Sequence, residues 1–428
     1  MEQCTRPCSQ CAGALKEERV VFTQEMKKTH TILIPTMLPI HFRFMANILE
    51  QKGYKVKILE NAGRSVVDEG LKNVHNDTCY PALLVIGQMI DALKSGEYDL
   101  DKVALLITQT GGGCRASNYI HLLRKALQKS GFGYIPVISL NIGGLEKNPG
   151  FTLSVSDYEK LMYAVILGDL IMLLANQCRP YEVEEGETDR TVNRWIEVMS
   201  EFFRGKKVLN WGRMRPYCTQ ILRDFAAIPK AGKQKIRVGV VGEIYVKYSP
   251  LGNNNLEDFL HSEGAEVVVP GLLDFCLYCV YNMIEDHKLY GGPKGKYWAA
   301  QAVYRYLVGK KRKLIELIRE EGTFDPPEDF EAIRAMAEGY ISTGMKMGEG
   351  WLLTAEMVEL IHKGINNIVC TQPFGCLPNH IAGKGMIHLI KEKNPQANIV
   401  AVDYDPGASE VNQQNRIKLM LANAAMAQ

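Results

Sequence analysis

The stretch Cys370-Thr371-Gln372-Pro373-Phe374-Gly375-Cys376-Leu377-Pro378-Asn379-His380 decides how the rest of the chain is interpreted. The apolar residues 367–369 precede it and predict a buried strand, and residues 381–393 follow it and predict a helix. Two cysteines therefore fall in a turn between a strand and a helix. In open α/β sheets such turns form the edge at which ligands bind.

The composition of this turn suits an anionic ligand. Its prolines and Gly375 fix the backbone and leave amides free, and a helix start adds a positive dipole end that favours a thiolate or an iron–sulfur cluster. The alternative is that both cysteines are structural, since a buried cysteine often acts as a small hydrophobe. His380 is a candidate proton donor, although a histidine at a helix start is more often a capping or packing residue.

Length and composition indicate a globular protein with two or three domains. The chain has 428 residues, of which 46% are hydrophobic and 23% charged, with a net charge of +2. This charge gives no reason to expect a nucleic-acid or membrane partner. We find no apolar run of transmembrane length and no apolar signal segment, so we expect a cytoplasmic protein. Eleven cysteines, an odd number, favour metal or redox use over a disulfide framework in that compartment.

The N-terminal segment 1–28 carries a second cysteine motif, Cys4-x3-Cys8-x2-Cys11. This spacing is able to hold three corners of an iron–sulfur cluster. Radical S-adenosylmethionine enzymes share the spacing, but Gln10 fills the position that usually holds an aromatic residue there. A zinc knuckle or a flexible tail without a ligand remains the alternative.

Alternating strand and helix patterns predict an α/β fold with parallel, doubly wound sheets. Predicted strands cover residues 31–37, 55–59, 103–108 and 136–141, and then 235–241, 266–269, 367–369 and 398–402. Between the two groups, residues 157–228 are mostly helical. We therefore predict a first α/β domain with a helical extension over residues 29–231 and a second α/β domain over residues 232–428.

Two further cysteines of the first domain precede predicted helices. Cys79 lies just before the helix over residues 82–94, and Cys114 follows the strand over residues 103–108 through a run of three glycines. Glycines let the backbone approach a ligand closely, so Gly112 and Gly113, with Gly375, are predicted to line the cofactor. By contrast, the pair Cys276 and Cys279 falls in a helical, apolar context and is interpreted as core packing.

Because such turns share one edge of a parallel sheet, we predict that Cys79, Cys114, Cys370 and Cys376 converge between the two domains. An iron–sulfur cluster there would be partly desolvated and could keep one iron open. Zinc is the alternative metal for four thiolates. The chain contains no Gly-x4-Gly-Lys-Ser/Thr loop, no Gly-x-Gly-x-x-Gly motif after its first predicted strand and no His-Glu-x-x-His motif.

Four segments of the chain resemble the 2-hydroxyacyl-CoA dehydratase / benzoyl-CoA reductase superfamily. These are Asn76-Asp77-Thr78-Cys79-Tyr80-Pro81, Thr110-Gly111-Gly112-Gly113-Cys114-Arg115, Gln372-Pro373-Phe374-Gly375-Cys376-Leu377-Pro378-Asn379-His380 and Asp403-Tyr404-Asp405-Pro406-Gly407-Ala408-Ser409. The likeness extends over most of residues 29–428. It is greatest to a branch that includes double-cubane cluster proteins and long proteins fused to an activase.

The resemblance implies two flavodoxin-like domains around a cysteine-bound [4Fe-4S] cluster, or an [8Fe-9S] double cubane held by six cysteines. It also implies a separate ATP-dependent activase with its own iron–sulfur cluster, which injects low-potential electrons. The candidate ligands in turns are Cys4, Cys8, Cys11, Cys79, Cys114, Cys370 and Cys376.

Two functions follow as hypotheses. The first is an anaerobic reductase or dehydratase that passes single electrons to a small substrate, which by family analogy is a CoA thioester. The second is a non-catalytic iron–sulfur relay component, with a structural zinc protein as a further alternative. A homodimer is compatible with either function.

Overall fold

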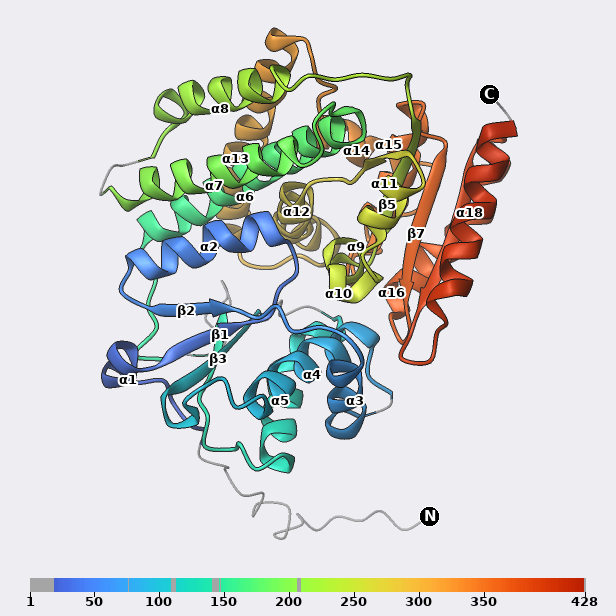
Figure 1. The fold of residues 1–428 in the computed structure, drawn as a ribbon. Coiled ribbons are helices and arrows are strands. Elements are labelled where there is room, and N and C mark those ends of the chain that lie inside the picture. Colours follow the sequence, from blue (N-terminus) through green and yellow to red (C-terminus); the bar gives the residue numbers. More distant parts are fainter. Residues whose placement is uncertain are drawn as a thin grey trace.

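The computed structural model describes residues 19–75, 77–108, 113–140, 146, 148–205 and 209–426. The predicted motif of Cys4, Cys8 and Cys11 lies outside the described residues, and so does Gly112. The chain folds as an α/β protein with two four-stranded sheets in which all strands are parallel. Figure 1 shows the first sheet in blue at the lower left and the second in yellow to red at the right.

The first sheet contains the four strands that the sequence predicts. They are β1 (Thr31–Ile34), β2 (Lys55–Ile58), β3 (Val103–Thr108) and β4 (Val137–Leu140), in the order β2-β1-β3-β4. The central strand β3 is buried at all positions but its last, as expected for a parallel strand covered on both faces.

The second sheet repeats this order. Its strands are β5 (Ile236–Gly242), β6 (Ala265–Val268), β7 (Asn367–Pro373) and β8 (Asn398–Tyr404), arranged β6-β5-β7-β8. The two sheets therefore fall on either side of the predicted boundary near residue 232.

The structure differs in two places from the secondary structure predicted for residues 367–393. Strand β7 continues to Pro373, so Cys370 lies inside the strand and not in the turn. The helix predicted over residues 381–393 is divided into α16 (Leu377–Ala382), a 3₁₀ turn η5 (Lys384–Met386) and α17 (Ile387–Lys393). The break falls at Gly383, whose missing Cβ would lie 2.3 Å from Asn379 Oδ1.

Helices α6, α7 and α8 form the extension that the sequence predicts, and they cover one side of the molecule (Figure 1). Helix α6 contacts α2 of the first half of the chain and β6 and α12 of the second half. The helices of the first half are α1 (Gln24–Thr29), α2 (Pro39–Gln51), α3 (Arg64–Asn73), α4 (Tyr80–Lys94), α5 (Tyr119–Lys129), α6 (Val155–Cys178), α7 (Glu187–Arg204) and α8 (Trp211–Ala226).

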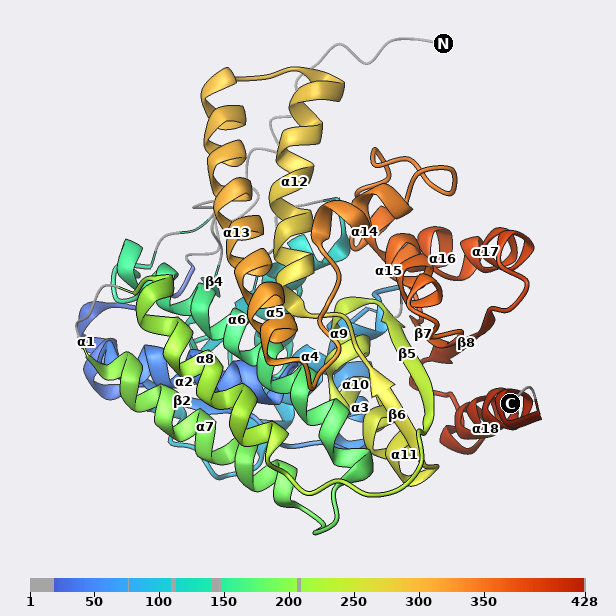
Figure 2. The same ribbon diagram turned by 90° about the horizontal axis from the view of Figure 1, so that it is seen from above.

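The second half adds a long antiparallel pair, α12 and α13, which projects from the rest of the protein in Figure 2. Gly291 and Gly292, both at positive φ, make the turn between them. Among the remaining helices of this half, α18 and α15 are the longest. In chain order the second half contains α9 (Ile244–Tyr248), α10 (Pro250–Asn253), α11 (Leu256–Ser262), α12 (Leu272–Tyr290), α13 (Lys294–Glu321), α14 (Phe330–Met336), α15 (Gly350–His362), α16, α17 and α18 (Glu410–Met426).

One segment of the described chain, Val155–Tyr181, is long and apolar enough to cross a membrane, contrary to our expectation from the sequence. Its mean hydropathy is 1.7, but 72% of its most apolar window is buried inside the protein. This burial is what a core helix between two layers requires.

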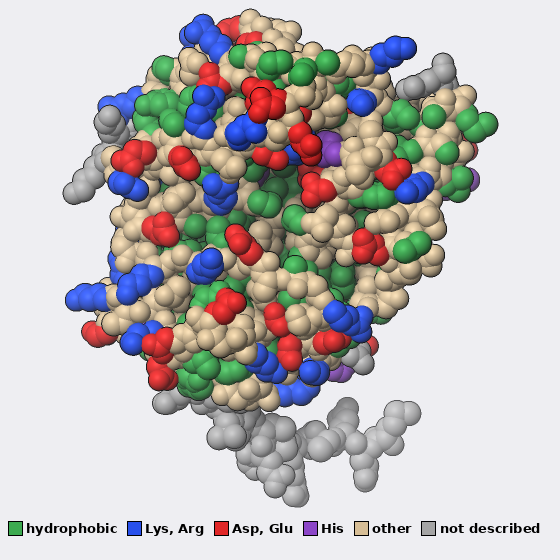
Figure 3. Space-filling view, in the orientation of Figure 1, with side chains coloured by type: hydrophobic (Ala, Val, Ile, Leu, Met, Phe, Trp, Pro, Cys, Tyr) green, Lys and Arg blue, Asp and Glu red, His purple; other side chains and the backbone are tan. Residues whose placement is uncertain are grey.

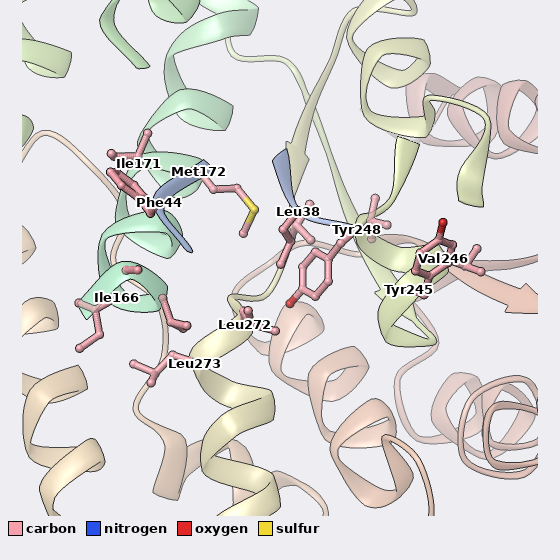
Figure 4. Packing of buried hydrophobic residues seen from close by; sticks show 14 of the residues in the cluster. Leu38, Phe44, Ile166, Ile171, Met172, Tyr245, Val246, Tyr248, Leu272 and Leu273 are labelled. Atoms are coloured by element: carbon pink, nitrogen blue, oxygen red, sulfur yellow. The ribbon is translucent and has the colours of Figure 1, made fainter. Parts of the chain in front are cut away.

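A single large hydrophobic cluster joins the two halves of the chain. It contains Leu33 and Leu105 from the first sheet and Val240 from the second. In Figure 4, Ile166 and Ile171 of α6 lie among the side chains of this cluster. Because the cluster runs through both sheets and the helices between them, the sheets hold a fixed position relative to each other, and so do their ligand-binding edges.

Candidate functional site

Three cysteines occupy the same structural position, the residue that precedes the first turn of a helix. Cys79 precedes α4, Cys114 precedes the 3₁₀ turn η3 (Arg115–Asn118) that leads into α5, and Cys376 precedes α16. At all three positions the backbone is extended and the side chain makes no capping hydrogen bond. None of the three thiols is therefore used to cap the helix or turn that it precedes.

Two hydrogen bonds and one glycine bring these turns together. The Tyr80 amide, next to Cys79, donates to the Phe374 carbonyl over 2.9 Å, and Arg115 donates to the Asp77 carbonyl. Gly375 has a φ of +72°, and a Cβ there would lie 3.0 Å from Cys79 Cα. These contacts bring the turns of Cys79, Cys114 and Cys376 together, and we call the space between these thiols the thiol cleft.

The thiols of the cleft are largely shielded from water. Cys79 is 5% exposed and Cys376 is 6% exposed, whereas Cys114 is half-buried. Burial raises the pKa of Cys79, and the hydrogen bond of 2.9 Å between its Sγ and Tyr119 Oη works in the opposite direction. Burial also raises the pKa of Cys114 to about 11. The metal-free protein therefore holds neutral thiols, and metal binding has to displace their protons.

Two glutamates that sequence reasoning missed complete the cleft. Glu243 precedes α9 and accepts a hydrogen bond of 2.9 Å from the Val246 amide, and Glu349 precedes α15 and accepts one of 2.8 Å from the Ile244 amide. Burial first and the charge of Glu349 second raise the pKa of Glu243 to about 8. Burial likewise raises the pKa of Glu349. The pair consequently keeps a proton at neutral pH.

The charges of both glutamates act on the thiols. Burial is the largest cause of the raised pKa of Cys376, and the Glu349 and Glu243 carboxylates raise it further, as they do for Cys114. The Glu243 carboxylate makes a smaller contribution in the same direction at Cys79. The sequence does contain a signal for Glu243, because it directly follows a buried strand and precedes a helix. Glu349 follows no strand, so only the fold brings it here.

Two residues of helix α12 lie near Glu349. Cys279 is exposed to solvent, yet the surrounding protein first and the Glu349 charge second raise its pKa to about 12. The neighbouring Tyr278 Oη has no hydrogen-bond partner among the described residues, and a Cβ on Gly350 would lie 2.6 Å from it. The core-packing interpretation is therefore wrong for Cys279, which is exposed, while Cys276 is half-buried.

Cys370 lies apart from the turns in which we expected it. It is fully buried in β7 within an apolar cluster, and its Sγ is 3.8 Å from Asn379 Oδ1. The sequence analysis ended this strand at residue 369, because Pro373 is of a type that is rare inside strands.

The other predicted residues have mixed outcomes. Gly375 allows the close approach to Cys79 described above. Gly113 lies against the side chain of Met347, which leaves no room for a Cβ at that position. His380 is exposed on α16, and its backbone amide donates to the Cys376 carbonyl over 3.1 Å. Its role as a proton donor stays a prediction.

The donor set fits a cluster better than a single ion. Within the part of the chain that the structure describes, no three His, Cys, Asp or Glu side chains are grouped closely enough to hold one metal ion. A tetrahedral zinc site needs its sulfurs about 2.3 Å from one centre. A multi-iron cluster occupies the space between its thiolates and holds them further apart, which suits three thiols on separate helix starts.

Neither a scan against protein-family models nor a search of the curated proteins finds a match for this chain. The superfamily resemblance consequently rests on the four quoted segments, and the function has to be argued from the thiol cleft itself.

Proposed function

We propose that the chain is an iron–sulfur protein that transfers single low-potential electrons to a small substrate, as a reductase or dehydratase. The observation that carries this proposal is the convergence of Cys79, Cys114 and Cys376 from three helix starts and two sheets. The shared strand order, second-first-third-fourth, supports two flavodoxin-like domains, whose ligands bind at this edge.

The residues of the cleft have distinct roles in this proposal. Cys79, Cys114 and Cys376 would hold a [4Fe-4S] cluster, and three protein thiolates leave one coordination position for a substrate. When bound, the cluster supplies one-electron chemistry. Tyr119 hydrogen-bonds the Cys79 sulfur, and Glu243 with Glu349 keeps a proton beside the cleft while burial excludes water. We do not include Cys370 in this ligand set, because it lies inside β7.

An [8Fe-9S] cluster requires more thiolates than the three of the cleft. Cys279, which is exposed, is a candidate for this, and Cys4, Cys8 and Cys11 are the predicted N-terminal ligands. Deletion of residues 1–12 separates the two cases. A single cubane keeps its iron count after the deletion, whereas a larger cluster with N-terminal ligands loses a large share of it.

The electron source in this proposal is a separate ATP-dependent activase that carries its own iron–sulfur cluster. The chain contains no nucleotide loop of the Gly-x4-Gly-Lys-Ser/Thr type that could supply this step itself. Because such low-potential chemistry is sensitive to oxygen, we propose an anaerobic cytoplasm as the location of the protein. ATP hydrolysis by the purified chain alone would contradict a separate activase.

An electron-relay component is the second candidate function. Phe374, Leu377 and Ile381, which flank Cys376 along the chain, are all exposed. Exposed apolar side chains beside a redox site favour docking of another protein. An iron that responds to added small ligands supports the enzyme, and a cluster whose irons are all thiolate-bound supports the relay.

The deciding experiment is the analysis of iron and acid-labile sulfide per chain after anaerobic purification, with low-temperature electron paramagnetic resonance. We expect a brown, oxygen-sensitive protein that contains both elements. Anaerobically prepared protein with stoichiometric zinc and no sulfide would overturn the proposal.

A further inference from the structure

One segment of the chain extends across the thiol cleft from the turn of Cys114 to the turn of Cys376. It consists of residues 342–349, between α14 and α15, and we call it the strap. The side chain of Met347 in the strap packs against Gly113, the residue before Cys114, and leaves no room for a Cβ there. The strap therefore contacts the first half of the chain directly beside a thiol of the cleft.

The next two residues of the strap reach the second half of the cleft. Gly348 lies against Pro378, two residues after Cys376, and a Cβ at Gly348 would be 3.0 Å from the Pro378 Cβ. Glu349 is buried and is one of the two carboxyl groups of the cleft. Three consecutive residues of the strap thus connect both cysteine turns with the carboxyl pair.

The backbone of the strap is held in place by α12. Thr343 Oγ1 donates to Glu285 Oε1 over 3.0 Å, and Lys346 forms an ion pair with Asp286. Both partners lie on this one helix, so the strap is fixed just before Met347. The part of the strap that moves at the least cost is therefore the Met347 side chain.

The side chain of Met347 has the properties of a gate. It is 43% exposed, so one side of it contacts Gly113 and another faces solvent. Methionine is unbranched and flexible, and it adapts its shape to what it contacts. Exposed side chains change rotamer within nanoseconds. A rotation of Met347 therefore uncovers Gly113, and with it the approach to Cys114, without moving the backbone.

The exposure of the thiols places the approach to the cleft at this gate. Cys114, which follows Gly113, is half-buried, whereas Cys79 and Cys376 are buried. A ligand of the thiols therefore meets Cys114 first, beside Met347.

The hollow between the two halves of the chain in Figure 3 is a different site. It holds a cavity of about 240 Å³ that is lined by residues of α2, α6 and the segment from α9 to α11. None of the three cleft cysteines and no residue of the strap lines this cavity. The cavity therefore gives a ligand no contact with the thiols.

We propose that Met347 is the gate of the thiol cleft and limits the size of the molecules that reach it. For the reductase or dehydratase this makes Met347 a residue that determines specificity: the substrate enters beside Gly113, and a small reacting end is admitted more readily than a bulky one. This consequence rests on the proposed function, whereas the gate itself is a property of the chain with or without a cluster.

Alkylation of the metal-free full chain tests the gate. The reagents are iodoacetamide and its larger N-phenyl derivative, iodoacetanilide, and with both the cysteine thiolate displaces iodide. The rate at Cys114 is measured for each reagent by mass spectrometry of the peptides, and the two rates are compared as a ratio. Because both reagents need the same thiolate, a change in the pKa of Cys114 cancels in this ratio, and the difference in access remains.

Met347→Ala removes the gate. We expect it to raise the rate of iodoacetanilide relative to iodoacetamide at Cys114 by at least about 10-fold, since the shorter side chain no longer fills the space beside Gly113. Met347→Trp, which enlarges the side chain, should lower the same ratio. An unchanged ratio in folded Met347→Ala protein would overturn the gate; if that variant does not fold, an unchanged ratio in Met347→Trp overturns it.

A second methionine provides the matched control. Met283 on α12 is 52% exposed and lies outside the strap. Met283→Ala should leave the ratio at Cys114 unchanged, and a rise equal to that of Met347→Ala would also overturn the gate.

Iron and sulfide, determined on anaerobically purified samples of the same variants, test the cluster separately. Protein without iron but with the expected ratios refutes the cluster alone. Protein that contains iron but shows unchanged ratios refutes the gate alone.

Discussion

The two sheets have the same strand order but carry different chemistry at their carboxyl ends. The first half of the chain supplies two thiols, Cys114 after β3 and Cys79 between α3 and α4, whereas the second half supplies one thiol, Cys376 after β7, together with the carboxylate Glu243 after β5. Glu349 joins Glu243 from the start of α15. One wall of the cleft therefore offers soft ligands, and the other adds a pair that keeps a proton.

This difference shows that equivalent positions in one topology need not share a task. The strand order places helix starts at a common edge, but the residue at each start decides what the edge binds. A cleft with unlike walls is suited to a reaction in which an electron and a proton arrive from different sides. The predictions below challenge this comparison, beginning with the largest effect.

The first prediction compares cysteines from both walls with the cysteine inside β7. Cys114→Ala and Cys376→Ala should each lose most of the iron, because each removes a soft ligand from one shared cluster. Cys370→Ala, only six residues before Cys376, should keep it, because its thiol lies in an apolar cluster. Iron and sulfide analysis checks all three variants. Full iron in Cys114→Ala would refute the thiol cleft.

The second prediction concerns a buried ion pair of α9, the helix that Glu243 precedes. Lys247 of α9 is 3% exposed and pairs with the buried Glu356 over 3.2 and 3.3 Å. Lys247→Met should lower the free energy of unfolding by about 3–5 kcal/mol, because it leaves a buried carboxyl group without its cation. Urea denaturation measures this change.

Two controls accompany this experiment. Arg204→Met breaks an exposed pair with Glu201 and should cost less than about 1 kcal/mol. The double variant Lys247→Met/Glu356→Leu should regain much of the lost stability, since both charges are removed together. A double variant as unstable as Lys247→Met would show that the ion pair is not the cause.

The third prediction tests the distance between the walls. Gly375→Ala should cost about 1–2 kcal/mol from its positive φ alone, and should also lower the iron content, because the new Cβ presses on Cys79. Gly364→Ala is the matched control: its φ is +75°, and no atom lies within 4 Å of the added Cβ. Stability and iron content are measured on both. Equal iron in the two variants would mean that the close approach does not matter.

The fourth prediction concerns pH. The pKa of Glu243 is raised from 4.5 to about 8, so between these values the folded state binds a proton that the unfolded state releases. Stability must then fall as pH rises through this range, by up to about 1.4 kcal/mol per unit. Glu243→Gln removes this titration and should give a flatter profile of unfolding free energy between pH 5 and 8. Parallel profiles would contradict the raised pKa.

Much of the fold was predictable because its strands are short apolar runs. The predicted strand over residues 103–108 matches β3. The predicted strand over residues 55–59 ends one residue beyond β2 (Lys55–Ile58). The extension of β7 to Pro373 was not predictable from local pattern. Phe374 donates to Tyr404 on β8, so Pro373 faces the other side, where pairing with β5 has ended at Thr371. The missing amide of proline therefore costs no ladder bond.

The thiols of the site were predictable and its carboxylates were not. Cysteines before helices are rare enough to attract attention, and the rule that turns of parallel strands share an edge applies to Cys114 and Cys376, whereas Cys79 follows α3. Glutamates are common on surfaces, so a single glutamate carries no signal until its burial is known. Glu349 is 6% exposed only because α9, α12 and the cysteine turns close around it.

The position of α6 has a consequence for how the protein is made. This apolar helix packs on α2, which precedes it in the chain, and on β6 and α12, which the ribosome has yet to synthesise when α6 emerges. At about 5–20 residues per second, roughly a hundred further residues take several seconds to tens of seconds. During that interval one face of α6 has no partner, so a fragment ending near residue 231 is expected to aggregate.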